Sequence, residues 1–267
     1  ERTTATWLRR SSRLTAPSDH HVTPDRRASD STSDRAVQAV LAVVRAVLPT
    51  AWTVLPTTAR RGRQWYTHPR RIRCVDPDTV RHEWADRTGT YSPEFYAQLG
   101  PNATSETLRE ILVERVGRDA SVLELGCSSG RHLAYLLDSG FSDLHGVEVN
   151  ADAFDVMADA FPDLHAQGEF SRDTIEATLP TFDDGAFDAV FSVETLQHVH
   201  PDNGWVFGDV ARVTDDTLVT VENEEGTEGA DVADDAEVNY VDGEFPLYYR
   251  DWGAVFGEHG LVEVATE

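Results

Sequence analysis

Lysine is absent from this chain of 267 residues, and all 23 of its basic residues are arginines. Acidic residues number 47, which gives a formal net charge of −24. A carboxylate surface this dense is typical of proteins that work in roughly molar salt, where a Debye length of about 3 Å screens repulsion between like charges. The composition therefore predicts a halophilic protein. In such a protein the negative charge does not by itself exclude a nucleic-acid partner, although nothing in the sequence favours one.

Sulfur-containing residues are also scarce. The two cysteines, Cys74 and Cys127, lie in very different sequence contexts, which argues against a disulfide framework and fits a reducing cytoplasm. The single methionine is Met157, and position 1 is a glutamate. We interpret the start of the chain as a fragment or as an extension that lies outside the natural protein.

An uninterrupted hydrophobic run of membrane-spanning length is missing as well. The most apolar stretch, residues 36–55, is broken by Gln38, Arg45 and Pro49 and is marginal for the ~20 residues that a bilayer span needs. A membrane location is therefore not expected, and the predicted location is cytoplasmic.

Charge is distributed unevenly along the chain. Residues 1–75 carry 14 arginines and 5 acidic residues, whereas residues 76–267 carry 9 arginines and 42 acidic residues. The first 33 residues are rich in Ser, Thr, Arg, Asp and Pro without apolar periodicity, a composition typical of disorder. Residues 1–75 are therefore predicted to be a disordered or non-native extension, and residues 76–267 to form the folded domain.

From residue 76 onward, short apolar strands alternate with helical stretches. Buried strands that alternate with helices form a parallel sheet covered on both faces. We therefore expect an α/β fold with a Rossmann-like, doubly wound, mostly parallel sheet that binds ligands at the carboxyl ends of its strands. Ser105 is expected to cap one helix. The expected strands are 121–125, 144–149, 164–170, 187–193, 218–222 and 261–265, and the expected helices are 78–87, 92–99, 105–116, 131–138, 151–161, 171–179, 204–213 and 250–259.

The most informative segment is a turn of small residues between a strand and a helix, within residues 122–132. Gly126 and Gly130 let the backbone approach a ligand closely, and the first amides of the helix face that ligand. A nicotinamide-dependent oxidoreductase would use the same design. Glu124 favours a different ligand, because a carboxylate there would repel a pyrophosphate and attract an ammonium group. S-adenosylmethionine carries such a group.

Two further acidic residues follow at regular spacing. Glu148 ends the next strand 24 residues after Glu124, where its oxygens can accept hydrogen bonds from both ribose hydroxyls. Asp173 stands 25 residues later and could bind the adenine amino group. Glu169 competes for that role, and an acid in the first turn of a helix also has a dipole explanation.

At these positions the sequence resembles the class I S-adenosylmethionine-dependent methyltransferases, especially those that act on small molecules. Residues 124–130 resemble the first family motif, Glu148 the ribose-binding acid, and residues 187–190 the motif on the fourth strand. Residues 196–199 and 210–213 resemble the segments that follow. The resemblance covers roughly residues 76–265.

The resemblance implies methyl transfer from S-adenosylmethionine to a small-molecule nucleophile. Two departures weaken it: Ser128 replaces a glycine that is usual in the first motif, and the family's seventh, antiparallel strand is not evident. The second departure suggests that the domain lacks its last strand through truncation at the C-terminus. The implied cofactor-binding residues are Glu124, Gly126, Cys127, Ser128, Gly130, Glu148, Val149, Asp173, Thr174 and Glu194.

His198 is the candidate general base, because imidazole titrates near neutrality and this residue would lie near the methyl group. It could instead cap or pack the following helix, and positioning alone can supply most of the rate of such a transfer. A metal site at His198, His200 and Asp202 is not expected. Substrate contacts are expected among the aromatic residues, namely Trp84, Tyr91, Tyr96, Tyr248, Tyr249 and Trp252.

The absence of two family motifs narrows the class of molecule that can accept the methyl group. The segment after the fourth strand lacks the Asn/Asp-Pro-Pro-aromatic loop of amino-methylating nucleic-acid enzymes, and Cys127 belongs to the cofactor turn, so no attacking cysteine is evident. A small metabolite of unknown identity is therefore the favoured acceptor. A catalytically silent cofactor-binding or interaction module stays open as the alternative, and the sequence does not predict an oligomeric state.

Overall fold

The computed structural model describes residues 2–9, 76–224, 238–241 and 245–266. Residues 1–12 and 73–267 group into one compact unit, whereas the second unit, residues 13–72, lies outside the described residues together with the apolar stretch 36–55. None of the described helices combines the length and apolar character needed to cross a membrane.

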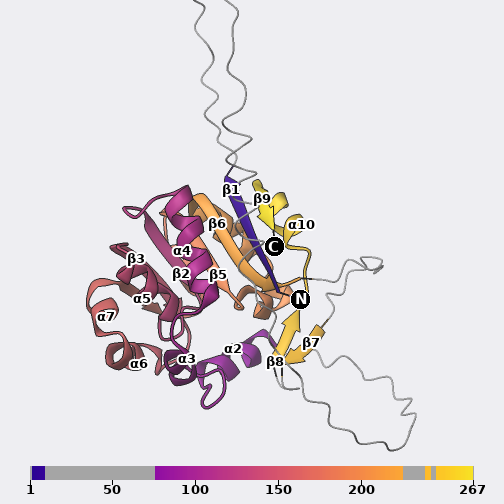
Figure 1. Cartoon of the computed structure of the whole chain (residues 1–267). Coiled ribbons are helices and arrows are strands. Elements are labelled where there is room, and N and C mark those ends of the chain that lie inside the picture. The colour runs from indigo at the N-terminus through magenta and orange to yellow at the C-terminus, as the bar shows by residue number, and fades with distance from the viewer. Residues whose placement is uncertain (1, 10–75, 225–237, 242–244, 267) are drawn as a thin grey trace, which may run out of the picture. The chain divides into compact units, whose positions relative to one another are not determined.

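A seven-stranded, mostly parallel sheet forms the centre of the first unit (Figure 1). Six of its strands run in the same direction, and β1 lies antiparallel between β6 and β9. A separate antiparallel pair, β7 (Val238–Val241) with β8 (Phe245–Tyr248), was not predicted. The strands in spatial order are β4 (Glu169–Arg172), β3 (Asp143–Glu148), β2 (Ser121–Leu125), β5 (Phe187–Val193), β6 (Thr214–Asn223), β1 (Arg2–Arg9) and β9 (Leu261–Thr266).

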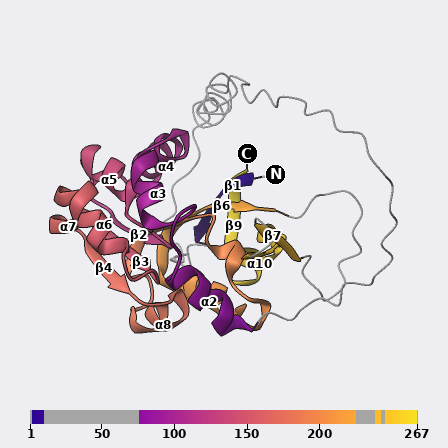
Figure 2. The same cartoon turned by 90° about the horizontal axis from the view of Figure 1, so that it is seen from below.

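Helices cover both faces of this sheet (Figures 1 and 2). Val122 and Leu123 are neighbours on β2 yet belong to different hydrophobic cores, because successive side chains of a strand point to opposite faces. The predicted α/β, doubly wound fold is therefore confirmed. One core is covered by α4 (Ala103–Arg115), α5 (Arg131–Asp138), α6 (Ala153–Ala160) and α7 (Pro162–Gln167), and the other by α8 (Ile175–Thr178), α9 (Val206–Val213) and α10 (Trp252–Glu258).

The strand β1 corrects the predicted domain boundary. Trp7 is 1% exposed, its indole N–H donates to Thr220 Oγ1 at 3.3 Å, and its ring centroid lies 5.7 Å from that of Phe256. Residues 2–9 are thus part of the core rather than of a disordered extension. They also supply an antiparallel strand to the sheet. Residues 10–75 lie outside the described residues.

Two local predictions are wrong for identifiable reasons. Leu164 lies in helix α7 rather than in a strand, since Pro162 at the first helical position suits a helix start, and the strand begins only at Glu169. Ser105 is the third residue of α4 and does not cap it. Asn102 is the cap: its Oδ1 accepts from the Ser105 amide at 3.2 Å, while Ser105 Oγ accepts from the Asn102 amide at 3.1 Å.

Candidate functional site

A pocket opens at the carboxyl ends of β2, β3 and β5, where the sequence analysis expected the ligand. Part of its wall comes from α2 (Pro77–Ala85). His198 and all the predicted cofactor-binding residues except Gly130 line this pocket, namely Glu124, Gly126, Cys127, Ser128, Glu148, Val149, Asp173, Thr174 and Glu194.

The turn after β2 requires two glycines for different reasons. Gly126 has φ 72°, and a Cβ atom there would lie 2.2 Å from Thr195 Oγ1. Gly130 has φ 81°, and a Cβ atom there would lie 2.6 Å from Leu164 Cδ2. Gly130 therefore lets α5 begin close against α7 and acts through packing. Ser128 holds a left-handed φ of 49°, so the backbone keeps the conformation that a glycine would adopt easily.

Glu148 joins this turn to the end of β3. Its Oε2 accepts from the Ser128 amide, and its Oε1 accepts from the amides of Val149 and Asn150, each at 2.8 Å. Burial raises the pKa of Glu148, and these three hydrogen bonds oppose that effect. Oε1 thus already accepts two hydrogen bonds and Oε2 one, which leaves an acceptor position on Oε2 for a ribose hydroxyl.

Glu124 is buried in the pocket wall without a full set of partners. The residue is 2% exposed, and its Oε2 has no hydrogen-bond partner. Burial raises the pKa of Glu124 well above its usual value, and the guanidinium of Arg131 opposes that shift. An unpaired buried acceptor is costly, and an ammonium group of a bound ligand would satisfy it. The site therefore fits S-adenosylmethionine at the position where the sequence placed its amino-acid end.

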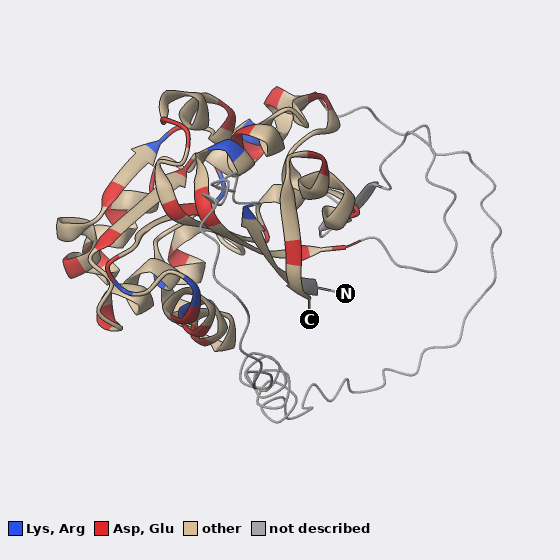
Figure 3. Ribbon diagram, turned by 90° about the horizontal axis from the view of Figure 1, so that it is seen from above, with Lys and Arg blue, Asp and Glu red and all other residues tan. Residues whose placement is uncertain are grey.

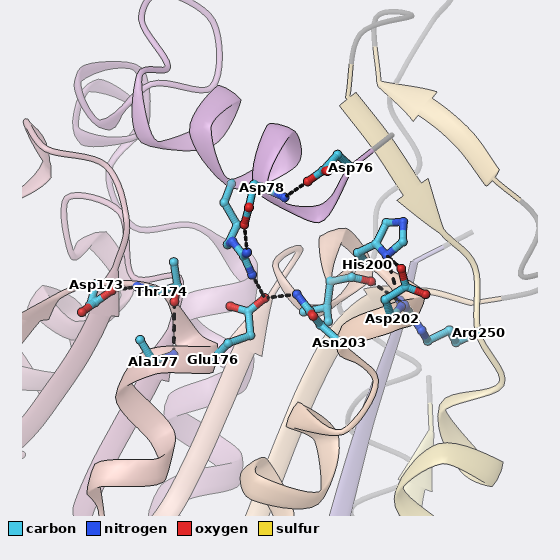
Figure 4. Close-up of polar contacts among 12 residues, drawn as sticks. Asp76, Asp78, Asp173, Thr174, Glu176, Ala177, His200, Asp202, Asn203 and Arg250 are labelled. Carbon is cyan, nitrogen blue, oxygen red and sulfur yellow. Dashed lines mark hydrogen bonds and ion pairs between the residues drawn. The ribbon is translucent and has the colours of Figure 1, made fainter. Parts of the chain in front are cut away.

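The loop between β4 and α8 carries Asp173 and Thr174 (Figure 4). Thr174 caps α8, because its Oγ1 accepts from the Ala177 amide at 3.1 Å, and Asp173 Oδ1 accepts from the Thr174 amide at 2.7 Å. Glu169 lies at the opposite end of β4, with Oε2 3.7 Å from His145 Nδ1, and does not line the pocket. Of the two competing acids, only Asp173 is at the site.

The loop after β5 forms the other end of the pocket. Glu194 has a left-handed φ of 53°, and the short 3-10 helix η2 (Leu196–His198) follows it. His198 Nδ1 lies 2.9 Å from the Pro246 carbonyl oxygen, which can only accept, so Nδ1 carries the ring hydrogen. Burial lowers the pKa of His198 to about 4. The ring is therefore neutral near pH 7, with Nε2 as an acceptor.

Helix α2 covers the pocket and is tied to it at two points that the sequence did not reveal. Arg81 Nη1 and Asn203 Nδ2 both donate to Glu176 Oε1, at 3.2 and 2.9 Å (Figure 4). Asn150 Nδ2 donates at 3.1 Å to two carbonyl oxygens at the end of α2, one of them that of Trp84. Glu176 and Asn150, which lie next to predicted site residues in the sequence, thus hold α2 over the pocket.

The aromatic predictions divide into two groups. Trp84, Tyr91 and Tyr96 line the pocket, and the Trp84 ring centroid lies 4.7 Å from that of His198. The later aromatic run is not part of the lining: Trp252 is 2% exposed and stacks on Phe256 in the core. A substrate contact is therefore not supported for Tyr248, Tyr249 or Trp252, because none of the three lines the pocket.

Residues 122–216 match the family described as Methyltransferase domain. The match begins on β2 and ends early on β6, so it spans the glycine turn, the two acidic strand ends and the loop after β5. This part of the chain is therefore similar to a methyltransferase domain, as the sequence motifs predicted. No curated protein matches the sequence significantly.

Many solved structures share the fold at low sequence identity. A 1,6-didemethyltoxoflavin-N1-methyltransferase from Burkholderia thailandensis is 18% identical, with a TM-score of 0.47 over 61% of this chain and 69% of that one. The PH0226 protein from Pyrococcus horikoshii is 19% identical, with a TM-score of 0.47 over 62% and 83%. Geranyl diphosphate C-methyltransferase from Streptomyces coelicolor is 20% identical, with a TM-score of 0.37 over 44% and 43%.

Proposed function

We propose that this protein transfers the methyl group of S-adenosylmethionine to a small molecule whose nucleophilic atom carries a proton. The observation that supports this proposal is the continuity of one pocket, which runs from the unpaired buried oxygen of Glu124 to the neutral ring of His198. Its cover of aromatic side chains from α2 and the following segment suits a small acceptor more than a polymer.

Each acidic residue of the cofactor half has one proposed role. Glu148 binds the ribose hydroxyls, Asp173 binds the adenine amino group, and Glu124 binds the ammonium group. The backbone of the turn at Gly126, Cys127 and Ser128 lies close to the cofactor. Bound in this way, S-adenosylmethionine supplies an activated methyl group, and the protein contributes orientation and exclusion of water.

His198 is proposed to orient the acceptor. Because Nδ1 donates to the Pro246 carbonyl, Nε2 can accept a hydrogen bond from an O–H or N–H group of the acceptor. Nε2 would take up the proton that the acceptor loses when it is methylated. With a pKa lowered to about 4, this imidazole is a weak base, so its main contribution is alignment of the nucleophile's lone pair.

Two measurements test this function. Calorimetric titration should detect binding of S-adenosylmethionine and S-adenosylhomocysteine but not of NAD, which Glu124 would repel. Transfer of a labelled methyl group into a cell extract should place the label in the small-molecule fraction. Label in protein or nucleic acid would contradict the proposed acceptor class, and binding without any transfer would favour a catalytically silent module.

Salt adaptation and a cytoplasmic location are proposed from composition. Acidic positions are spread over the helices on both sides of the sheet, whereas arginines are few (Figure 3). Since the Debye length shrinks from about 30 Å at 0.01 M to about 3 Å at 1 M salt, repulsion within this surface becomes confined to near neighbours. The melting temperature should therefore rise from millimolar to molar salt. A flat or falling melting temperature would contradict halophily.

A further inference from the structure

We infer that Glu222, at the end of β6, is a positioning residue for the methyl-transfer end of the pocket. It does not line the pocket, and it acts through the loop 194–199 that follows β5. The inference goes beyond the proposed function and rests on it only in naming this loop as the methyl-transfer end.

A single buried carboxyl group collects the free amides of this loop. Glu222 is 0% exposed, and its Oε1 accepts from the amides of Thr195 and Leu196 at 3.2 and 3.1 Å. Its Oε2 accepts from the Gln197 amide at 3.2 Å, and Ser192 Oγ donates to Oε1 at 2.6 Å. Three consecutive amides that open a helical turn would otherwise be buried without partners.

The loop backbone needs such an anchor because part of it is strained. Glu194 holds a φ of 53°, which costs about 1–3 kcal/mol in a residue other than glycine and persists only where the surroundings enforce it. Its amide donates to the Val221 carbonyl at 2.8 Å, directly beside Glu222. The strained residue is therefore held between β5 and the end of β6.

An oppositely charged residue holds the other end of the loop. Arg250 donates to the carbonyl oxygens of Leu196, at 3.4 Å, and of Val199. Its guanidinium lies 5.0 Å from the ring centroid of Phe207. The carboxyl group at the amide end and the guanidinium at the carbonyl end complement the dipole of the turn.

This arrangement determines what the loop presents to the pocket. Thr195 fills the space that a Cβ on Gly126 would occupy, and His198 lines the cavity beside Trp84. Thr195 carries the first of the three anchored amides, and His198 directly follows the last of them. Loss of the anchor should therefore move both of them without removing any group that contacts cofactor or acceptor.

The test compares Glu222→Gln with Ser192→Ala in the full chain. The glutamine keeps the volume of the side chain, but its NH2 group would face amide N–H groups. Ser192→Ala removes a hydrogen bond that Glu222 accepts from outside the loop. Amide hydrogen exchange of residues 195–197 should become at least 10-fold faster in Glu222→Gln and stay near wild type in Ser192→Ala, while β5 and β6 keep their protection.

A second readout reports the position of His198 directly. NMR titration of the ring should give a pKa near 4 in the wild type, where burial, the Pro246 carbonyl and the charge of Arg250 act on it. In Glu222→Gln the pKa should move upward, toward the value of a hydrated imidazole of about 6.5. Glu222→Asp keeps the charge on a shorter side chain and should give intermediate values, and it replaces the glutamine variant if that protein does not fold.

Two results would overturn the inference. Unchanged exchange at 195–197 together with an unchanged His198 titration would exclude an anchoring role. Faster exchange throughout β5 and β6 would make Glu222 a general stability residue. Both measurements on the loop are made without cofactor. If the wild type fails to bind S-adenosylhomocysteine, the proposed function is contradicted, but the exchange rates and the His198 titration still test the role of Glu222.

Discussion

The two ends of the pocket are built in different ways. Most of the proposed cofactor end comes from residues 121–150, in which strand, turn, helix and strand follow one another along the chain. The loop after β5 takes its anchors from distant segments: Glu222 lies 25 to 27 residues beyond the amides that it binds, and the Pro246 carbonyl lies 48 residues beyond His198. A site built from neighbouring residues can be recognised as a sequence motif. A site held by remote partners can be recognised only in the folded structure.

The largest expected effect concerns the most remote segment of all, β1. Trp7→Ala should lower the free energy of unfolding by about 3–5 kcal/mol, because it removes a buried indole and leaves Thr220 Oγ1 without its donor. Denaturant unfolding measures the loss. Leu99→Ala, at a side chain that is 56% exposed, is the control and should change little. Equal stability of Trp7→Ala and wild type would remove β1 from the core.

Glu148→Ala probes the contiguous end. The variant should bind S-adenosylhomocysteine more weakly by about 1.5–3 kcal/mol, or roughly 10- to 100-fold, because hydrogen bonds to a charged group are lost. Calorimetric titration measures the affinity, and circular dichroism checks that the fold persists. Glu169→Ala, in an acid outside the pocket, should keep wild-type affinity. Unchanged affinity in a folded Glu148→Ala would contradict the ribose assignment.

A pH experiment tests His132, on the helix of the contiguous end. Its Nδ1 lies 2.8 Å from Ser105 Oγ, and burial lowers its pKa to about 3. Since the unfolded state takes up the proton near pH 6.5, this residue stabilises the fold above that pH and loses its contribution as the pH falls. From pH 6.5 to 5 the loss is about 2 kcal/mol.

His132→Gln should therefore show a shallower decline of the free energy of unfolding over that interval. The wild type and the variant must be compared in the slope of the free energy of unfolding against pH, because Glu222 also affects that slope. Burial raises the pKa of Glu222 to about 7, so its contribution to stability falls as the pH rises, opposite to that of His132. Parallel curves for wild type and variant would contradict the buried, neutral state of His132.

The smallest effect is expected from a matched pair of glycines that joins the two ends. Gly89 and Gly126 have similar φ values of 75° and 72°, but a Cβ on Gly89 would meet nothing within 4 Å, whereas one on Gly126 would collide with Thr195. Alanine at either position should cost about 1–2 kcal/mol of backbone strain. Only Gly126→Ala should also weaken S-adenosylhomocysteine binding, as measured by calorimetry. Equal affinities of the two variants for S-adenosylhomocysteine would show that the contact between Gly126 and Thr195 does not affect cofactor binding.

The sequence predicted an element correctly where its local signals agreed with one another. The strand at 187–193 and the helix at 131–138 have the predicted bounds, because apolar runs and a glycine turn delimit them. The prediction failed at Leu164, where a proline-initiated helix competed with a short apolar run. The sequence also gave no sign of the role of Glu222. Glu124 and Glu148 stand out because they follow the spacing of adjacent strands, whereas Glu222 is one of 47 acidic residues without a distinguishing pattern.

By itself, the sequence determined the alternation of strands and helices, the glycine turn around Gly126 and the acidic residues at the ends of β2 and β3. Those features depend on residues that are near one another in the chain, through side-chain periodicity and the backbone freedom of glycine. Only the tertiary structure decided that residues 2–9 complete the sheet and that Glu222 and Arg250 hold the loop beside His198. Pairing between strands and burial of polar groups bring together residues that are remote in sequence, and no local pattern encodes which remote partner satisfies them.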